Sequence, residues 1–481
     1  MTVTFGLSID DRALAVAAGG RVLGVAPAIA RRTGGGELLG TTALDILRSR
    51  PAEASARHWS DIAAESAAGA AALPVAAADL RQRLRAAGAA RGATGDGLGA
   101  TGDGLGAAGQ TVPDSAWVAV SAAFSPRALS DVLAVAQAAG MRTHGFVDAA
   151  VATVAPLGLA RPAIVLEMGL FHVAATAVEC GATVRRRRSI VSRSGGLLDI
   201  CQSWLDVVSA AMVLRTRFDP LHDAAVEQRL FGELPRLSAQ TVETGSATVA
   251  LEGPAGEQHE VQIARDQLAA AAAAPYRELE RCLHELRRAG APVAVIVPQA
   301  LLALAGLRER LETLSDCELV VVPEGWAAAV VSQMPVDEAA NAPVRLVRRL
   351  AATATSPQGG APQRQQLGER PGEEIDPTHL LHAGRALPLT ARGLTVGREG
   401  NGADIAVPEG AAGISRRHCT ILRDGDGVVL VDHSRHGTWV NDERVAGRAR
   451  LHAGDQVRIG EPGIELALIS VGGGGAQATP D

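Results

Sequence analysis

The chain has 481 residues, of which 47% are hydrophobic and only 2% aromatic. This length allows two or three globular domains whose cores are filled by Ala, Val and Leu. The formal net charge of -6 argues against a nucleic-acid-binding protein, and the absence of lysine excludes mechanisms that need one, such as Schiff-base formation or P-loop phosphate binding.

The five cysteines are far apart and form no CxxC pair, which favours free thiols in a reducing cytoplasm over disulfides or a zinc site. The N-terminus has no basic segment followed by an apolar one, so no signal peptide is predicted. The most apolar window, residues 292–307, is interrupted by Pro298 and Gln299 and is too short to span a membrane. We therefore expect a soluble, cytoplasmic protein.

Strands and helices alternate over residues 1–335. A strand near residues 3–9 precedes two apolar runs separated by Gly19-Gly20, which is the pattern of a hairpin. Further strands are predicted near residues 116–124, 163–169, 172–181, 292–298 and 318–322, with helices between them, one of them a long helix over 265–289. This alternation indicates a mixed α/β domain over residues 1–335.

Three segments are predicted to lack regular structure. Residues 92–110 form a tandem glycine-rich heptapeptide that neither follows a strand nor opens a helix, so a flexible loop is favoured over a phosphate-binding one. Residues 336–376 are rich in Pro, Gly and Gln and are predicted to be a flexible linker, and residues 472–481 a disordered tail. Between the last two, residues 377–471 show short alternating strands separated by turns, as in an all-β sandwich.

The sandwich carries four motifs in order: Gly397-Arg398, SRRH at Ser415–His418, DHSRHGTWVN at Asp432–Asn441, and LHAGDQVRIG at Leu451–Gly460. Together they resemble the forkhead-associated (FHA) family, a β-sandwich that binds phosphothreonine. A phosphate dianion needs a guanidinium fork and nearby hydroxyl or amide donors, and Arg398, Ser415 and Arg416 supply these groups.

The resemblance also assigns roles to single residues. It implies that Arg398 and Ser415 contact the phosphate, that Arg416 assists, and that Ser434, His436, Gly437 and Thr438 lie along the peptide main chain. It implies structural roles for Gly397, His418 and Asn441, with His418 as a buried brace between the loops. A direct contact between His418 and the ligand is the alternative.

Two features of this region need separate treatment. His436 stands where the family usually has asparagine, so the peptide preference departs from the family pattern, and a protonated imidazole beside the phosphate would make binding depend on pH between about 6 and 7.

Ser415, His418 and Asp432 also suggest a catalytic triad, but no GxSxG elbow accompanies them. The sandwich pattern explains these residues better, so no catalytic residue is expected.

Residues 116–158 are similar to the segment of DnaK-type chaperones in which a strand, a helix and a second strand lead to another helix. The order of elements over most of residues 1–335 resembles the actin-like (ribonuclease-H-like) ATPase superfamily to which those chaperones belong. The nucleotide motifs depart from that family. Ser8 replaces the metal-linked Asp, and Pro298-Gln299 replace a glycine pair.

In the second phosphate loop, Glu167 and Gly169 remain, but bulky residues follow them where the backbone must approach phosphate. A vestigial nucleotide site is therefore expected at Ser8, Glu167, Gly169, Gly195 and Gly196, with no metal and no cofactor. Bound ATP is the alternative.

These features predict a bacterial signalling adaptor that reads phosphothreonine on the product of a Ser/Thr kinase through its FHA module. The α/β domain is then a pseudo-ATPase that makes protein contacts. The competing hypothesis is a nucleotide-binding, DnaK-like ATPase regulated by FHA docking. Neither hypothesis involves nucleic acid or a membrane span.

Overall fold

Three antiparallel strands open the chain in the computed structural model: β1 (Phe5–Ile9), β2 (Ala13–Ala18) and β3 (Arg21–Pro27). The turn between β2 and β3 is Gly19-Gly20, with φ of +55° and +87°. A two-residue turn with both φ values positive matches the twist of a hairpin and favours glycine. The hairpin predicted at this glycine pair is confirmed.

The structure describes residues 4–31, 44–93, 113–289, 292–314, 317–336, 344–353, 357–358, 360–367, 376–382, 385–399, 402–407, 413–425, 427–441, 443–452, 455–460 and 464–469. Most of the glycine-rich repeat, and all of the C-terminal tail from 472, lie outside these residues. The chain divides into two units. The α/β unit is Met1–Cys282 with Val293–Gln366, and the β unit is Leu283–Pro292 with Leu367–Asp481.

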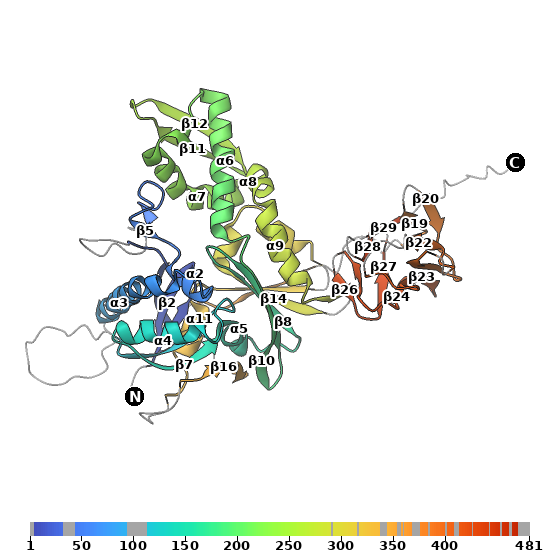
Figure 1. Cartoon of the computed structure of the whole chain (residues 1–481), viewed down its shortest axis with the longest axis horizontal. Helices are drawn as coiled ribbons and strands as arrows, with labels where there is room; N and C mark the ends of the chain where they lie inside the picture. The colour runs from blue at the N-terminus through green and yellow to red at the C-terminus, as the bar shows by residue number, and fades with distance from the viewer. Residues whose placement is uncertain are drawn as a thin grey trace, which may run out of the picture. The chain divides into compact units, whose positions relative to one another are not determined.

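The first sheet of the α/β unit has the order β16-β7-β6-β1-β2-β3. It adds β6 (Ser115–Val120), β7 (Arg142–Asp148) and β16 (Leu346–Val347), which run parallel to β1. One face is covered by α2 (His58–Ala63), α3 (Gly69–Ala93) and α4 (Ala128–Ala138), whose apolar residues share one core with the sheet (Figure 1).

The second sheet repeats this arrangement. Its order is β17-β10-β9-β8-β14-β15-β18, built from β8 (Ala163–Met168), β9 (Val173–Glu179), β10 (Thr183–Ser192), β14 (Val293–Pro298), β15 (Cys317–Val322), β17 (Arg349–Ala351) and β18 (Gln363–Leu367). As in the first sheet, an antiparallel meander (β8, β9, β10) is extended from its first strand by two parallel strands. The helices α5 (Ala149–Val154) and α11 (Trp326–Val331) bury residues against both sheets.

A helical insertion follows β10. It contains α6 (Leu197–Thr216), α7 (Ala224–Thr244), the hairpin β11 (Ser246–Glu252) and β12 (Gln258–Ala264), α8 (Arg265–Ala271) and α9 (Ala273–His284), which lie together in Figure 1. Helix α6 has the length and the mean hydropathy, 1.5, of a membrane-spanning helix. A single helix of this kind among the described residues is weak evidence for a membrane span. One face of the helix is packed, since the Trp204 indole donates to the Leu268 carbonyl at 2.9 Å and is 1% exposed, whereas Leu214 is 79% exposed.

The β unit consists of two facing sheets. One has the order β13-β26-β25-β28-β29-β19-β20 and the other β22-β21-β23-β24-β27. Their strands are β13 (Arg288–Ala289), β19 (His379–His382), β20 (Arg385–Pro388), β21 (Leu394–Arg398), β22 (Ile405–Val407), β23 (Cys419–Asp424), β24 (Gly427–Asp432), β25 (Thr438–Val440), β26 (Glu443–Val445), β27 (Arg448–Leu451), β28 (Gln456–Ile459) and β29 (Ile464–Ile469). A single apolar cluster fills the space between the sheets, so this unit is a β-sandwich.

Two features differ from the sequence-based expectation. Within the segment 336–376, the strands β16, β17 and β18 pair with sheets of the α/β unit. Leu346 and Leu350 pack on its apolar clusters, which explains why these residues are ordered although their neighbours are rich in Pro and Gly. The prediction of one long helix over 265–289 is also wrong, because α8 ends at Ala271 and α9 begins at Ala273. Pro275 lies in the first turn of α9, and in a continuous helix its ring would clash with the carbonyl of Ala271.

Candidate functional site

Two loops meet at one end of the sandwich. Residues 413–418 lead into β23, and residues 433–437 join β24 to β25. Arg398, the last residue of β21, holds the first loop: its amide donates to the Ser415 carbonyl at 3.2 Å and its Nη2 to the Ile414 carbonyl at 2.7 Å. The structure thus places Arg398 and Ser415 side by side, as the phosphate-contact prediction requires.

His418 connects the two loops. Its side chain is fully buried, its Nδ1 accepts a hydrogen bond from the Ser415 amide at 3.2 Å, and its Nε2 donates to the Gly437 carbonyl at 3.0 Å. This pattern requires the neutral ring with its proton on Nε2. Burial lowers the pKa of His418, which keeps the ring neutral. His418 therefore occupies the bracing position between the loops.

The second loop is held by its own side chains. Asp432 Oδ1 accepts from the Ser434 amide at 2.9 Å and from the Thr438 hydroxyl at 2.7 Å, and Ser434 Oγ accepts from the Gly437 amide at 2.8 Å. The Arg435 amide reaches Ser415 Oγ at 3.3 Å, which ties this loop to the first. These bonds leave both loops fixed before a ligand arrives, so little ordering entropy is lost on binding.

Two glycines are required by the backbone, Gly397 because of close approach and Gly437 because of its positive φ. A Cβ on Gly397 would lie 2.0 Å from the Arg416 carbonyl oxygen. Gly437 has φ of +105°, and a Cβ there would lie 2.6 Å from Arg444 Nε. A larger residue at Gly397 would displace the loop that carries Ser415 and Arg416.

Arg398, Ser415 and the two loops joined through His418 form the rim of the sandwich. The remaining predicted residues lie at this rim or behind it. The Arg416 and His436 side chains are exposed, and His436 lies next to Gly413, with its Cβ 3.8 Å from the position of a Cβ there. Asn441 has φ of +50° and closes a turn: its Nδ2 donates to Asp455 at 2.8 Å, and its Oδ1 accepts from the Gln456 amide at 2.9 Å. Asn441 thus supports the sandwich rather than the rim.

The same contacts test the triad interpretation. A general base needs a free ring nitrogen directed at the serine hydroxyl. Both nitrogens of His418 instead bond to backbone groups, and Asp432 is bonded to its own loop. Ser415, His418 and Asp432 are therefore arranged as a loop support and not as a proton relay.

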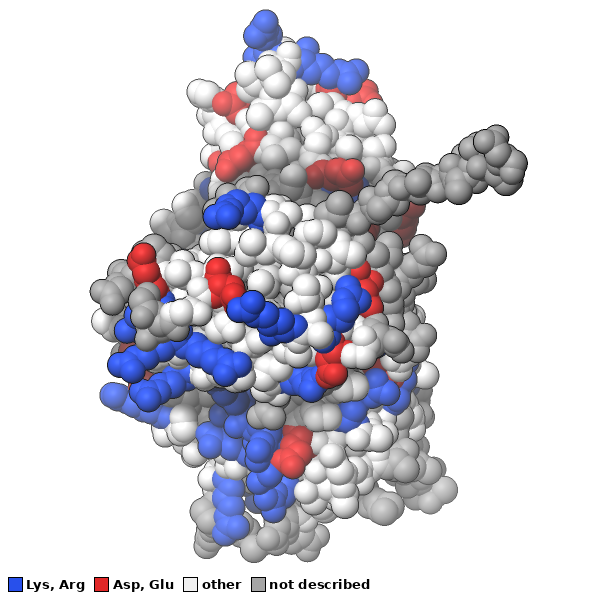
Figure 2. All heavy atoms as spheres, turned by 90° about the vertical axis from the view of Figure 1, so that its right-hand side faces the viewer, with Lys and Arg blue, Asp and Glu red and all other residues white. Residues whose placement is uncertain are grey.

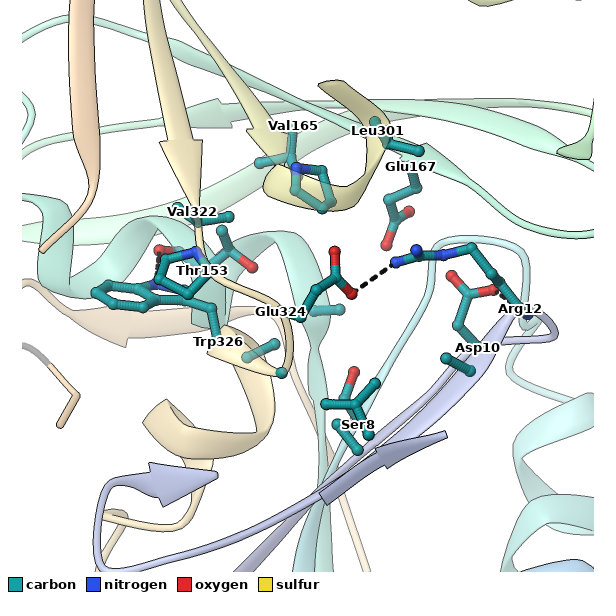
Figure 3. Close-up of a pocket in the computed structure, with 18 of the residues that line it drawn as sticks. Ser8, Asp10, Arg12, Thr153, Val165, Glu167, Leu301, Val322, Glu324 and Trp326 are labelled. Carbon is teal, nitrogen blue, oxygen red and sulfur yellow. Dashed lines mark hydrogen bonds and ion pairs between the residues drawn. The ribbon is translucent and has the colours of Figure 1, made fainter. Parts of the chain in front are cut away.

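A second candidate site lies in the α/β unit, between its two sheets. Ser8, Glu167 and Pro298 are among the residues that line a pocket there. Figure 3 shows the Arg12 guanidinium reaching Glu324 across this pocket, and the two groups form an ion pair of 3.0 Å. The free volume is about 100 Å³, whereas ligand pockets commonly measure about 300–1,000 Å³.

The loop after β8 is occupied by a carboxylate of the same chain. Asp11 is 2% exposed and accepts hydrogen bonds from the amides of Leu170 at 2.8 Å and Phe171 at 3.3 Å, and from His172 Nδ1 at 3.2 Å. A Cβ on Gly169 would lie 2.0 Å from Asp11 Oδ1. Successive backbone amides of this kind form an anion-binding concavity, and here the anion is Asp11.

The helix that follows is satisfied in the same way. The first amides of α6, on Leu197 and Leu198, donate to the carbonyls of Gly169 at 2.9 Å and Leu170 at 3.1 Å. A Cβ on Gly196 would lie 2.4 Å from the Leu170 carbonyl, so this glycine is needed for packing. The predicted residues Gly169, Gly195 and Gly196 come together here, but the amides of Leu170, Phe171, Leu197 and Leu198 already have partners.

The acidic groups around this loop have displaced pKa values. Burial and the charge of Asp11 raise the pKa of Asp10 to about 6, and burial and the charge of Asp10 raise the pKa of Glu167 to about 8. Burial would lower the pKa of His172, but its hydrogen bond to Asp11 and the charge of Asp11 outweigh it and raise the pKa to about 9. The same bond lowers the pKa of Asp11 despite its burial.

Asp10, Asp11 and His172 also have a spacing that suits a metal ion. A metal ligand must be deprotonated, whereas the hydrogen bond to Asp11 favours the protonated form of His172, and Asp11 already accepts bonds from two amides and from His172. The residues present therefore fit neither a magnesium ion nor a nucleotide phosphate in this conformation. The predictions of no metal and no cofactor are not tested by this finding.

Sequence reasoning missed Asp11, Arg12 and Glu324. The acidic pair Asp10-Asp11 directly after the first strand was the signal that could have drawn attention to this loop.

A family model for the FHA domain matches residues 394–460, from β21 to β28. This range contains Arg398, both loops and His418. No curated protein matches the chain. The chain is thus multidomain, with a mixed α/β N-terminal region and an FHA region that is a β-sandwich, and the FHA domain implies a phosphopeptide-binding protein-interaction module.

Proposed function

We propose that the chain is a phosphothreonine-reading signalling adaptor of the bacterial cytoplasm. Its FHA domain binds a partner phosphorylated by a Ser/Thr kinase. Its α/β unit is an actin-like scaffold that makes protein contacts without hydrolysing nucleotide. The observation that carries the proposal is the rim formed by Arg398, Ser415 and the two loops joined through His418.

Recognition follows from the groups that this rim presents. The planar Arg398 guanidinium lies at a strand end with its Nη2 on the Ile414 carbonyl. Charge-assisted bonds from such a group to phosphate are stronger than those from neutral donors, which favours its use by a phosphate ligand. Ser415 Oγ keeps its own proton to donate, because it accepts its bond from the Arg435 amide. Arg416 adds an exposed positive charge beside it. A phosphate dianion therefore meets two arginines and a hydroxyl on rigid supports.

The actin-like assignment of the α/β unit is supported by its repeated sheets. Each has an antiparallel meander extended from its first strand by two parallel strands, and the shared helix α11 packs on the first sheet and the second. The pseudo-ATPase role is supported by the Arg12–Glu324 ion pair across the pocket and by Asp11 in the amide loop.

The alternative, an ATPase regulated by FHA docking, requires that both contacts break before phosphate can enter. The Asp11 contact involves two amides and a charged histidine in a buried setting, where an unpaired charge is costly. We therefore favour the adaptor.

A phosphopeptide library tests the proposal. The full-length chain is immobilised and exposed to phosphothreonine peptides of varied flanking sequence, together with unphosphorylated copies of the same peptides. Retention of phosphorylated members alone is expected, because the rim is built for a dianion. Equal retention of both sets would refute phosphothreonine reading.

A further inference from the structure

The FHA loops carry more positive charge than one phosphate uses. Arg416 and Arg417 on the first loop, Arg435 on the second, and Arg444 on β26 are all exposed. Arg444 belongs to the same surface, since its Nη2 lies 3.5 Å from the His436 carbonyl oxygen. We call these four residues the rim arginines.

Within the part of the chain that the structure describes, none of the rim arginines forms an ion pair with a carboxylate. Other arginines of the β unit do: Arg423 and Arg450 pair with Asp376, and Arg448 pairs with Asp424. Asp432, the last residue of β24, accepts hydrogen bonds from Ser434 and Thr438 through its Oδ1. The positive charge at the rim is thus compensated less than elsewhere in the same unit.

Although they come from different elements, the rim arginines lie beside successive parts of the second loop. At its beginning, Arg417 Nη2 lies 3.2 Å from the Thr420 hydroxyl, which also bonds His433 at 3.1 Å. At its end, Arg444 lies beside Gly437. The Ser415 hydroxyl meets the middle of the loop, at the Arg435 amide. A peptide whose phosphate is bound at Ser415 would therefore have an arginine on each side of it.

A neighbouring titratable group responds to this charge. Burial, together with the charge of Arg417, lowers the pKa of His433.

In Figure 2 every basic side chain drawn in blue is an arginine, because the chain has no lysine. This choice matters for recognition, since arginine binds carboxylate or phosphate with two parallel bonds and lysine does not.

We infer that this surface selects a phosphothreonine segment with further anionic groups on both sides of the phosphothreonine, one toward Arg417 and one toward Arg444. The groups are carboxylates of Asp or Glu, or a second phosphate, which offers the same chemistry. This inference rests on the proposed phosphothreonine binding. It adds that the preferred partner segments are acidic or multiply phosphorylated.

A peptide series on the full-length chain tests it. Four peptides share one phosphothreonine: one has neutral flanks, one has acidic residues on both sides, one has a second phosphothreonine among neutral residues, and one has basic flanks. At about 0.05 M salt we expect the acidic peptide to bind at least about tenfold tighter than the neutral one, and at about 0.5 M salt we expect most of this advantage to vanish. The third peptide shows whether phosphate serves as well as carboxylate.

Equal affinities for the neutral, acidic and basic peptides would overturn the inference while leaving phosphothreonine reading intact. Failure of all four peptides to bind would instead overturn the proposed function.

Variants locate the effect. Replacing both Arg417 and Arg444 by glutamine should remove the advantage of the acidic peptide and leave affinity for the neutral peptide within about twofold. The matched change to lysine should keep a large part of the advantage, because the charge is retained. Arg385→Gln, on the exposed strand β20, is the control. An advantage that survives the double glutamine change in a folded protein would contradict the inference.

Discussion

His418 is the residue on which the two FHA loops depend. It accepts from Ser415 through Nδ1 and donates to Gly437 through Nε2, so a second ring proton would break the bond to the Ser415 amide. Ser415 is the predicted phosphate contact, and its position therefore depends on the protonation of a residue that does not touch the phosphate.

This dependence predicts a loss of stability in mild acid. The ordinary pKa of 6.5 applies in the unfolded chain, and burial lowers the pKa of His418 in the native state. The native state thus binds fewer protons, so the contribution of His418 is complete above pH 6.5 and falls as the pH drops from there through the lowered pKa. Thermal melts of the native chain and His418→Gln at about pH 7.5 and pH 5.5 measure it. The native chain should lose more thermal stability on acidification than the variant, and equal losses would contradict the account.

The sequence could predict single residues only where partners are close along the chain or belong to a short motif. Arg398, Ser415 and His418 are within a few dozen residues of one another and carry the family pattern. Asp11 and His172 are 161 residues apart, and Arg12 and Glu324 are 312 apart. Their pairing depends on the sheets that bring the loops together, which no local pattern specifies.

The loop after β8 and the N-terminus of α6 lie together, and hydrogen bonds within the protein use the amides of both. Two pairs of adjacent amides, on Leu170 and Phe171 and on Leu197 and Leu198, all donate to groups of the protein. Such donors form an anion site only when they are free.

A direct consequence is that Mg-ATP should not bind. Isothermal titration of the full-length chain with millimolar Mg-ATP should give no saturable heat, because Asp11 holds the loop amides and the Arg12–Glu324 pair crosses the pocket. A phosphopeptide titration of the same sample shows that the protein is active. Saturable binding of Mg-ATP would favour the regulated ATPase.

Elements were predictable where periodicity was strong. The strands β1, β2, β3, β6, β8, β9, β14 and β15 and the Gly19-Gly20 turn follow from apolar runs and glycine. The strands β16, β17 and β18 were missed because they are short, β18 is almost entirely polar, and the surrounding residues are rich in Pro and Gly. The strand β13, of two residues, pairs in parallel with β26 of the sandwich, although it precedes the FHA region by about ninety residues. Pairing over such a distance leaves no mark in the local sequence.

The whole molecule has two parts with different proposed roles, an FHA sandwich that binds a phosphopeptide and an α/β unit that serves as a scaffold. The FHA match to residues 394–460 and the sandwich around it carry the recognition, and the α/β unit offers two sheets with a closed site. Composition alone narrows the classes of function. The net charge of -6 argues against nucleic-acid binding, and the absence of lysine excludes lysine-dependent phosphoryl transfer. The proposed function depends above all on the binding of phosphothreonine by Arg398 and its loop.

The affinity of full-length Arg398→Ala for a phosphothreonine peptide that the native chain binds is the decisive measurement of this binding. Removing one partner of a charge-assisted contact costs about 2–5 kcal/mol, so affinity should fall by about 30-fold or more. The control variant Arg385→Ala should bind as the native chain does, and the thermal melt should show that Arg398→Ala remains folded. Native affinity in a folded Arg398→Ala protein would contradict the account.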